Sequence, residues 1–334
     1  MLLSKRFKMM LSNANAIKNV PFSFFLKESY VNINSNTKYY DHFIHSEYYR
    51  GNIFYGIAND IKRFTGYTAK IPACIEHGLY LGEYSNPVEG KESGLPATVT
   101  FGHRRVTTLK NAGANPIAIG PYILYADVIK NLYEEVRSWL KSGSTLLVMP
   151  SHSTKDISSV YCIDQFITAV NQFASEHNFC NIIVNIYFRD CNPKVIEAYK
   201  SNGWLVVCAG HMCDPLFLRR LRTFIELSDC TLSNSFGTHV GYSVALNTPH
   251  VILGEKPKRV DLVRDNVTSK MLKTVDEEID YISDFFRVDS LSISPQQIEI
   301  VNQYWGLDCV RGKEELRSLL EAAHLKMINR DNLY

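Results

Sequence analysis

The chain has 334 residues, of which 46% are hydrophobic and 21% are charged, and its formal net charge is +2. This composition is typical of a folded globular protein and excludes a disordered or fibrous chain. A single hydrophobic core stops growing near about 250 to 300 residues, so two domains are expected. Because Lys and Arg are scattered among acidic residues, the charge pattern argues against nucleic acid as a partner.

Targeting signals are the next feature to consider. No apolar stretch approaches the roughly 18 to 20 residues that a membrane-spanning helix needs, and the N-terminus lacks the apolar region and cleavage site of a signal peptide. We therefore expect a cytoplasmic protein. The basic and apolar segment 1–10 is compatible with contact at the inner face of a membrane, although a disordered or packed terminus is the favoured interpretation.

The first 127 residues are predicted to form one α/β domain. After about 40 polar residues, Ile53, Ile57 and Ile61 recur at four-residue steps and indicate a helix from Ser46 to about Gly66. Short apolar strands are expected within 69–82, 97–102 and 115–126, with a turn and a short helix after the second strand.

From residue 128 the alternation of helices and strands becomes more regular. Continuous apolar strands between helices are typical of a parallel sheet that is buried on both faces, so we predict a Rossmann-like domain over residues 128–290. C-terminal helices over 291–334 begin with a Ser294–Pro295 start. The expected helices are 128–141, 161–178, 193–202, 214–227 and 239–247, and the expected strands are 145–150, 181–187, 204–210, 230–234 and 250–253.

The ends of the strands are the places to look for a site, because ligands of open α/β sheets bind beyond the carboxyl ends of the strands. Five of the ten histidines fall at such ends or at the helix starts that follow. One histidine of this kind is as often a packing residue as a catalyst, but their concentration favours a functional site. They are His77, His103, His152, His211 and His239.

The segment 228–253, "SDCTLSNSFGTHVGYSVALNTPHVIL", carries the clearest signal. We expect Ser233, Asn234 and Ser235 to cap a helix whose first turn contains Gly237 and Thr238. The free N–H groups and dipole of such a helix start form an anion site suited to phosphate. A purely structural helix cap is the alternative. The spacing matches neither a dinucleotide-binding fingerprint nor a P-loop.

Three other strand ends contribute candidate side chains. The loop at 150–154 offers Ser151, His152 and Ser153 as phosphate or base contacts, and its alternative role is to cap a helix near residue 156. Glu76 or His77 is a candidate general base. The group of His103, Arg104 and Arg105 is suited to anionic substrate groups, with solvated surface charge as the alternative.

Two α/β domains with facing loops and C-terminal helices resemble the GT-B glycosyltransferases. The closer similarity is to bacterial enzymes that build capsule and lipopolysaccharide chains. "IEHGLYLG" is similar to the His-Gly loop of their acceptor domain, and the 228–253 block is similar to the part of the donor domain that holds the nucleotide phosphates. This resemblance covers roughly residues 70 to 255 and implies two Rossmann-like domains facing a cleft.

The resemblance also implies an activity. An E-x7-E arrangement is absent from the 228–253 block, which disfavours a UDP- or ADP-hexose and favours a CMP-activated acidic sugar, as in sialyl- or Kdo-transferases. GT-B enzymes usually need no bound metal, so we expect no metal and no cofactor besides the sugar donor.

The expected function is transfer of a sugar to a saccharide or lipid-linked acceptor in surface polysaccharide synthesis. A UDP-sugar 2-epimerase and a non-catalytic subunit with the same fold remain alternatives. An epimerase requires carboxylates in the cleft, whereas the strand ends here offer histidines. The residues expected to bind the nucleotide are Ser151, His152, Ser153, His211, Ser233, Asn234, Ser235, Gly237, Thr238 and His239.

Overall fold

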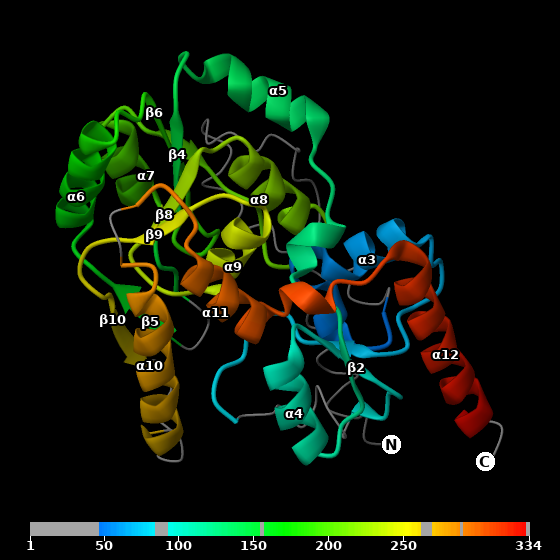
Figure 1. The fold of residues 1–334 in the computed structure, drawn as a ribbon. Helices are drawn as coiled ribbons and strands as arrows, with labels where there is room; N and C mark the ends of the chain where they lie inside the picture. Colours follow the sequence, from blue (N-terminus) through cyan, green and yellow to red (C-terminus); the bar gives the residue numbers. More distant parts are fainter. Residues whose placement is uncertain (1–46, 84–92, 154–156, 262–268, 288–289, 332–334) are drawn as a thin grey trace, which may run out of the picture.

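The computed structural model describes residues 47–83, 93–153, 157–261, 269–287 and 290–331 (Figure 1). It is a mixed α/β protein whose two larger sheets are parallel. The basic segment 1–10 and Thr154 lie outside the described residues. Over the part of the chain that is described, no helix combines the length and apolar character that crossing a membrane requires.

The segment expected to be one helix from Ser46 is divided in two. A 3-10 helix, η3 (Arg50–Gly56), precedes the α-helix α3 (Ile57–Thr65). Tyr55 and Gly56 have left-handed backbone angles, with φ of 58° and 73°, and these angles break the helical path between the two pieces. Gly66 ends α3 in the left-handed conformation, as its position in the sequence indicated.

A three-stranded parallel sheet forms the first part of the fold. Its strands are β1 (Cys74–Ile75), β2 (Thr98–Thr100) and β3 (Pro116–Ala118), which lie side by side in chain order. The helix α4 (His103–Asn111) connects β2 to β3, and the 3-10 turn η5 (Tyr122–Tyr125) follows β3. All three strands predicted for this part of the chain are present and are shorter than expected.

The second sheet is a five-stranded parallel sheet in the order β7-β6-β4-β8-β9. The chain runs from β4 outward to β6 and β7, and then returns to the other side of β4 to form β8 and β9. The direction of winding therefore reverses between β4 and β8, and this is the place where open α/β sheets bind ligands. The strands are β4 (Thr145–Val148), β6 (Asn181–Asn185), β7 (Leu205–Val207), β8 (Cys230–Ser233) and β9 (His250–Ile252).

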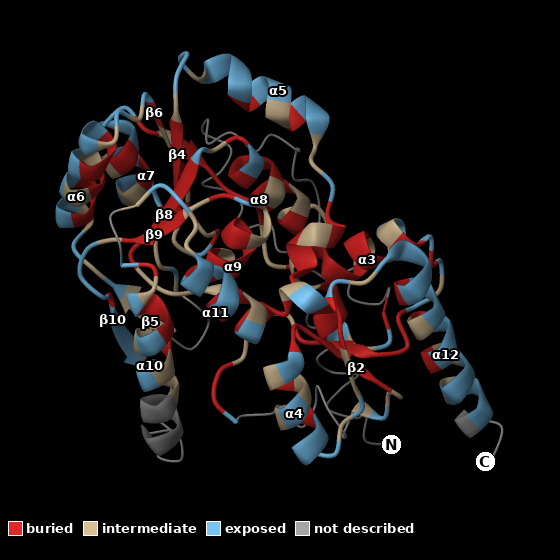
Figure 2. Cartoon of the chain, in the orientation of Figure 1, coloured by how far each residue is buried: buried red, intermediate tan, exposed pale blue. Residues whose placement is uncertain are grey.

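Helices cover both faces of this sheet, which explains its continuous apolar strands. Leu146 and Val148 belong to a core shared with α6 and α7, whereas Leu147 belongs to the core shared with α8 and α9. The buried strands lie between these helices in Figure 2. The helices are α5 (Lys130–Trp139), α6 (Ile163–Glu176), α7 (Pro193–Lys200), α8 (Phe217–Glu226) and α9 (Thr238–Ala245).

A short ribbon and a long helix differ from the prediction. Instead of a helix near residue 156, β5 (Ile157–Val160) pairs antiparallel with β10 (Lys258–Asp261), because each β-prone segment supplies the other's hydrogen-bonding edge. Arg259 lies opposite Ser159 in this ribbon. The helix α10 (Ser269–Asp284) follows, where the sequence was interpreted as a last sheet region.

The Ser-Pro helix start near the C-terminus is confirmed. Ser294 caps α11 (Pro295–Trp305): its hydroxyl accepts a hydrogen bond from the Gln297 N–H, and the Gln297 side chain accepts from the Ser294 N–H. The chain continues through the 3-10 turn η6 (Leu307–Cys309) into α12 (Lys313–Asp331).

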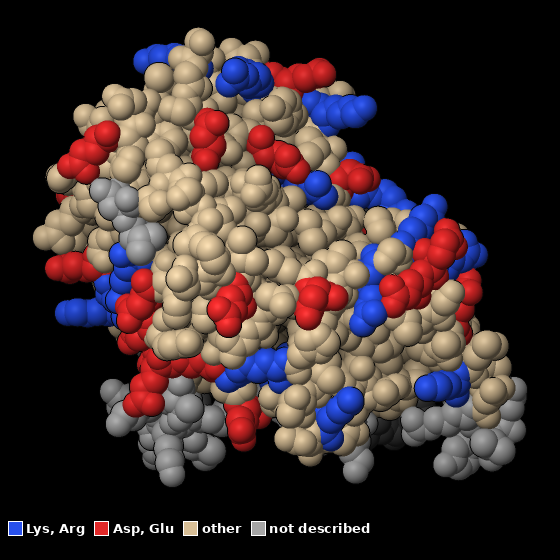
Figure 3. All heavy atoms as spheres, in the orientation of Figure 1, with Lys and Arg blue, Asp and Glu red and all other residues tan. Residues whose placement is uncertain are grey.

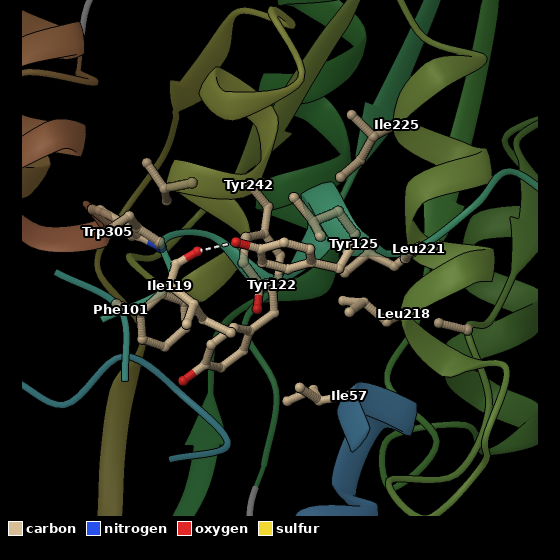
Figure 4. Packing of buried hydrophobic residues seen from close by; sticks show 14 of the residues in the cluster. Ile57, Phe101, Ile119, Tyr122, Tyr125, Leu218, Leu221, Ile225, Tyr242 and Trp305 are labelled. Atoms are coloured by element: carbon tan, nitrogen blue, oxygen red, sulfur yellow. Dashed lines mark hydrogen bonds between the residues drawn. The ribbon is translucent and has the colours of Figure 1, made fainter. Parts of the chain in front are cut away.

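The two parallel sheets share one hydrophobic core. The rings of Phe101, after β2, and Tyr122 stack with centroids 4.3 Å apart. The same cluster contains Leu218 and Leu221 of α8 and Tyr242 of α9 (Figure 4). The loop after β1 is therefore held close to the loops of the second sheet, while the proposed domain boundaries at 127 and 290 stay a prediction.

Candidate functional site

A cavity of about 600 Å³ lies at the carboxyl ends of the strands. Loops from both parallel sheets line it, together with the ribbon and one side of α10. Eight predicted site residues line the cavity: His77, Ser151, His152, Asn234, Ser235, Gly237, Thr238 and His239. Most of the remaining lining side chains are apolar or aromatic, which is typical of sites for small molecules.

Asn234 and Ser151 meet at the point where the winding of the sheet reverses. Asn234 follows β8, and its Oδ1 atom accepts a hydrogen bond of 2.7 Å from the backbone N–H of Ser151, which follows β4. The side chain is buried, and its Nδ2 atom has no hydrogen-bond partner among the described residues. A buried amide donor is costly when it is unsatisfied, so this atom is suited to a ligand acceptor in the cavity.

The N-terminus of α9 forms the neighbouring part of the wall. Gly237 is its N-cap residue, and no side chain caps the helix. This corrects the expectation that Ser233, Asn234 and Ser235 cap it. Ser233 is fully buried, and its hydroxyl donates to the backbone oxygen of Ser235 at 2.7 Å, while the Asn234 side chain accepts from Ser151 instead of from the helix. The first-turn N–H groups of α9 therefore have no side-chain cap at the cavity.

Thr238 and His239 complete this helix start. The Thr238 hydroxyl accepts a 3.2 Å hydrogen bond from the backbone N–H of Leu79, so it connects the loop after β1 to α9. The His239 ring folds against Gly237, where any larger residue would collide with it. Burial, with a smaller electrostatic contribution from nearby His152, lowers the pKa of His239 to about 3. The ring is therefore neutral at physiological pH, and its shielded Nε2 atom has no partner among the described residues.

His77 occupies the loop after β1 and lines the same cavity. Its ring contacts aromatic neighbours edge-on, with centroids 5.1 Å from Phe54 and 5.9 Å from Tyr80. The adjacent Gly78 also lines the cavity and lies close to Thr238. The histidine of the predicted His-Gly loop and the helix start of the 228–253 segment are therefore brought together in one site.

Glu76 and Arg105 do not reach the cavity, in contrast to the roles expected for them. Glu76 is fully buried, and both of its carboxylate oxygens accept 2.9 Å hydrogen bonds from Arg105 Nε. The Thr100 hydroxyl donates a further bond of 2.7 Å to this carboxylate. The two side chains satisfy each other inside the protein, so they stabilise the end of β1 and leave His77 as the candidate base.

Three further predicted residues support the loops without lining the cavity. The backbone N–H of Ser153 donates to Asp190 at 2.9 Å. His211 packs against Phe188, accepts a hydrogen bond from the Cys213 N–H, and has its pKa lowered to about 4 by burial. Ser233 is the buried last residue of β8, and its hydroxyl is 3.0 Å from His250 Nε2 of β9. We assign these side chains to the structure of the strand ends.

His103 and Arg104 also lie away from the cavity lining. Arg104 forms an ion pair with Glu278 of α10 and lies over the ring of Tyr304. The side chain of His103 is exposed beside Asp308. Arg104 was expected to bind the anionic group of a substrate, but it pairs with Glu278 and lies outside the described lining of the cavity. The anionic group of a ligand therefore requires other partners.

The basic side chains that do line the cavity were missed from the sequence. They are Lys256, Arg259 and Arg287. Each forms an ion pair with an acidic side chain: Lys256 with Asp280 at 2.7 Å, Arg259 with Asp276, and Arg287 with Asp284. Figure 3 shows charges of both signs gathered over the ribbon and α10. Asp280 is the one acidic residue among the described residues of the lining. The run "GEKPKRV" (254–260), shortly after β9, was the signal available for Lys256 and Arg259.

Aromatic side chains form a second group that the sequence did not indicate. The Tyr55 and Tyr187 hydroxyls are 3.4 Å apart, and the Tyr187 ring lies 4.3 Å from the ring of His152. Tyr55 takes its place through its left-handed backbone angle, which no pattern in the sequence predicts. Such rings provide flat surfaces on which a nucleobase or the apolar face of a sugar can pack.

No protein-family model and no curated protein matches the sequence. Among solved structures, the wall teichoic acid polymerase TagF aligns at 11% identity and a TM-score of 0.37 over 71% of this chain. The UDP-GlcNAc 2-epimerase from Neisseria meningitidis, bound to UDP-GlcNAc, aligns at 14% identity and a TM-score of 0.34 over 66% of this chain. The pneumococcal O-GlcNAc transferase GtfA, in complex with UDP and GlcNAc, aligns at 11% identity and a TM-score of 0.34 over 75% of this chain.

This chain spans 59%, 58% and 52% of those three chains, less than two thirds of each. Identities and scores this low leave the function to be argued from the cavity itself.

Proposed function

We propose that this protein is a glycosyltransferase of GT-B type that moves a sugar from a nucleotide-sugar donor to a saccharide or lipid-linked acceptor. A CMP-activated acidic sugar is the favoured donor, and surface polysaccharide synthesis at the inner face of a membrane is the proposed setting. One observation carries the proposal: an uncapped helix start and a buried, unpartnered amide donor line the same cavity at the reversal of the sheet.

The nucleotide phosphate is proposed to bind at the N-terminus of α9. Free N–H groups and the helix dipole attract an anion there, and Asn234 Nδ2 supplies a further donor. Lys256, Arg259 and Arg287 also line the cavity, beside the acidic partners Asp280, Asp276 and Asp284 respectively. A ligand carboxylate or phosphate that replaced one of these partners would pair with the same cation, and this is compatible with an acidic sugar as donor.

The transfer step is proposed to use His77 as general base. Its imidazole takes the proton of the acceptor hydroxyl while the hydroxyl oxygen forms a bond to the anomeric carbon of the sugar. The bond from that carbon to the phosphate oxygen breaks, and the nucleotide leaves with the electron pair. The α9 N–H groups and Asn234 stabilise the charge that develops on the departing phosphate.

The charge of the lining favours transfer over epimerisation. A 2-epimerase that works by elimination needs carboxylates in position to move protons, and Asp280, the acidic residue of the described lining, is paired with Lys256. A non-catalytic subunit is the remaining alternative, and its activity in a complex would not depend on His77.

A thermal-shift screen of the full chain with CMP, UDP, GDP and their sugars tests the proposal. A ligand at about 100 times its dissociation constant stabilises a protein by about 2.7 kcal/mol, so we expect CMP or its sugar to raise the melting temperature. If no nucleotide raises it, the proposal is wrong. Conversion of a UDP-sugar to its epimer without acceptor would establish the epimerase instead.

Two substitutions separate binding from chemistry. His239→Ala is expected to weaken nucleotide binding far more than it lowers stability, whereas His77→Ala is expected to abolish transfer and leave nucleotide binding intact. His177→Ala is the control, because His177 packs against Phe173 and lies outside the described lining. Activity of the His77→Ala variant equal to that of the unmodified protein would identify a non-catalytic subunit.

A further inference from the structure

Three side chains with metal-binding atoms meet outside the cavity. His103, the first residue of α4, approaches Asp308 and Cys309 of η6. His103 Nε2 lies 3.4 Å from Cys309 Sγ and 3.3 Å from one oxygen of Asp308, whose other oxygen lies 3.5 Å from the sulfur. Over the described ranges, no other group of three or more His, Cys, Asp or Glu side chains has such a spacing.

These separations are close to the edges of a metal-centred tetrahedron. Zinc lies about 2.3 Å from sulfur, about 2.0 Å from imidazole nitrogen and about 2.0–2.2 Å from carboxylate oxygen. Tetrahedral angles at those lengths place sulfur and nitrogen about 3.5 Å apart, sulfur and oxygen about 3.5–3.7 Å apart, and nitrogen and oxygen about 3.3–3.4 Å apart. The carboxylate oxygen near the nitrogen is not the one near the sulfur, so a rotation of the Asp308 carboxylate is needed to bring one oxygen to both, and the three ligand atoms already lie within 4.8 Å of one another.

The backbone around the three residues is fixed by the contact of two glycines. Gly102 and Gly306 precede His103 and the η6 turn, and a side-chain carbon on Gly102 would lie 2.8 Å from the Gly306 Cα atom. Gly306 also adopts a left-handed φ of 69°. This close approach brings the start of α4 to η6 and leaves the ligand atoms little freedom before a metal arrives, which reduces the ordering cost of binding.

We propose that His103, Asp308 and Cys309 bind a divalent cation of the zinc class. The thiolate and imidazole suit a borderline-soft metal, and the two negative charges of thiolate and carboxylate balance its double positive charge. Binding forms a metal–sulfur bond and releases the proton of the Cys309 thiol. Cys309 is buried, whereas 71% of the His103 side chain and 50% of the Asp308 side chain are exposed, so solvent supplies the fourth ligand.

The proposed role of the metal is structural. None of the three residues belongs to the described lining of the cavity, so no transfer step passes through this site. The site joins α4 of the first sheet to the segment between α11 and α12. Metal binding would therefore cross-link two parts of the chain that are 206 positions apart in sequence. The proposal is independent of the proposed glycosyltransferase function.

Titration with Co²⁺ tests this site in the full chain, after removal of bound metal by a chelator and of any polyhistidine tag. A cobalt–thiolate bond gives a charge-transfer band in the near ultraviolet, and four-coordinate Co²⁺ gives intense visible bands. We expect both bands to saturate at one equivalent of Co²⁺ and to disappear when Zn²⁺ is added in excess. Zn²⁺ is also expected to raise the melting temperature.

His103→Asn is the main test variant, because the His103 side chain is exposed and its replacement is expected to cost little stability. We expect it to weaken Co²⁺ binding by about 100-fold or more, since it removes a ligand, and to abolish the melting-temperature increase. Cys309→Ser is expected to remove the charge-transfer band. Cys162→Ser is the matched control, because Cys162 is an exposed free cysteine outside the group, and its bands should be unchanged.

Three results would overturn the proposal. They are the absence of a thiolate band in the folded unmodified protein, the survival of the bands in His103→Asn, and their loss in Cys162→Ser. Any of these outcomes would show that the three side chains form only a hydrogen-bonded group.

Discussion

The guanidinium of Arg105 and the carboxylate of Glu76 form an ion pair at the end of β1 that is almost completely out of water, with 3% and 0% of the two side chains exposed. Removal of one partner leaves the other charge buried without compensation. We expect Glu76→Gln to lower the free energy of unfolding by about 3–5 kcal/mol, as measured by urea denaturation.

The control for this variant is Glu226→Gln, which breaks the more exposed pair with Arg222 and should cost about 0.5 kcal/mol or less. A Glu76→Gln protein that is as stable as the control and lacks transfer activity would restore Glu76 as a candidate base.

Asn234→Asp separates the two functions of the Asn234 side chain. The substitution keeps the oxygen that accepts from Ser151 and replaces the unpartnered Nδ2 donor with a negative oxygen. We expect a lower free energy of unfolding, because the new carboxylate is buried, and at least about a 10-fold increase in the dissociation constant of the nucleotide for the folded variant, or about 1.4 kcal/mol, measured by calorimetry. Asn192→Asp is the control, because aspartate caps α7 as well as asparagine does. Unchanged affinity in Asn234→Asp would exclude Asn234 from phosphate binding.

The pH dependence of stability should report on Asp60. Burial raises the pKa of this carboxyl to about 7, against the opposing effect of Arg63 and Arg219 and with a contribution from Asp127. The folded state therefore binds more protons than the unfolded state between about pH 4 and pH 7, and the free energy of unfolding falls as pH rises through this window. The slope is at most about 1.4 kcal/mol per pH unit.

Asp60→Asn removes this contribution. We expect the variant to gain stability relative to the unmodified protein when pH is raised from about 5 to about 8, in urea denaturation at both values. His239 and His211, whose pKa values are lowered by burial, act in the opposite direction, and their effect cancels in the comparison. A stability difference that is independent of pH would contradict the raised pKa.

Gly241→Ala tests the contact between α9 and α11. Alanine normally stabilises a helix by about 1 kcal/mol relative to glycine. Here a side-chain carbon would overlap the fully buried ring of Trp305, whose Nε1 donates to the Thr238 backbone oxygen. We expect a net loss of about 1–3 kcal/mol in the free energy of unfolding. Gly312→Ala, at the residue before α12 where nothing lies nearby, should cost less, about 0.5 kcal/mol. Equal stability of the two variants would contradict the packing.

Much of the second sheet was predictable because its strands are buried on both faces and carry continuous apolar runs. The same pattern did not show that Tyr55 would break a helix, since a left-handed tyrosine is imposed by its tertiary neighbours. The sequence pattern also did not show that Glu76 and Arg105 pair with each other. A residue near a strand end can face either a ligand or the protein interior, and the pattern does not distinguish these two orientations. His103 and Cys309 are too distant in sequence for metal-ligand spacing to connect them.

The ribbon of β5 and β10 has a consequence for insertions and deletions. Ser159 and Arg259 both line the cavity and lie opposite each other in a pairing of only four residues a strand. Because side chains alternate between the faces of a ribbon, a slip of one residue in β10 would turn Arg259 to the opposite face. Loss or gain of a single residue between β9 and β10 would thus change the charge of the cavity while leaving every residue of the five-stranded sheet in place.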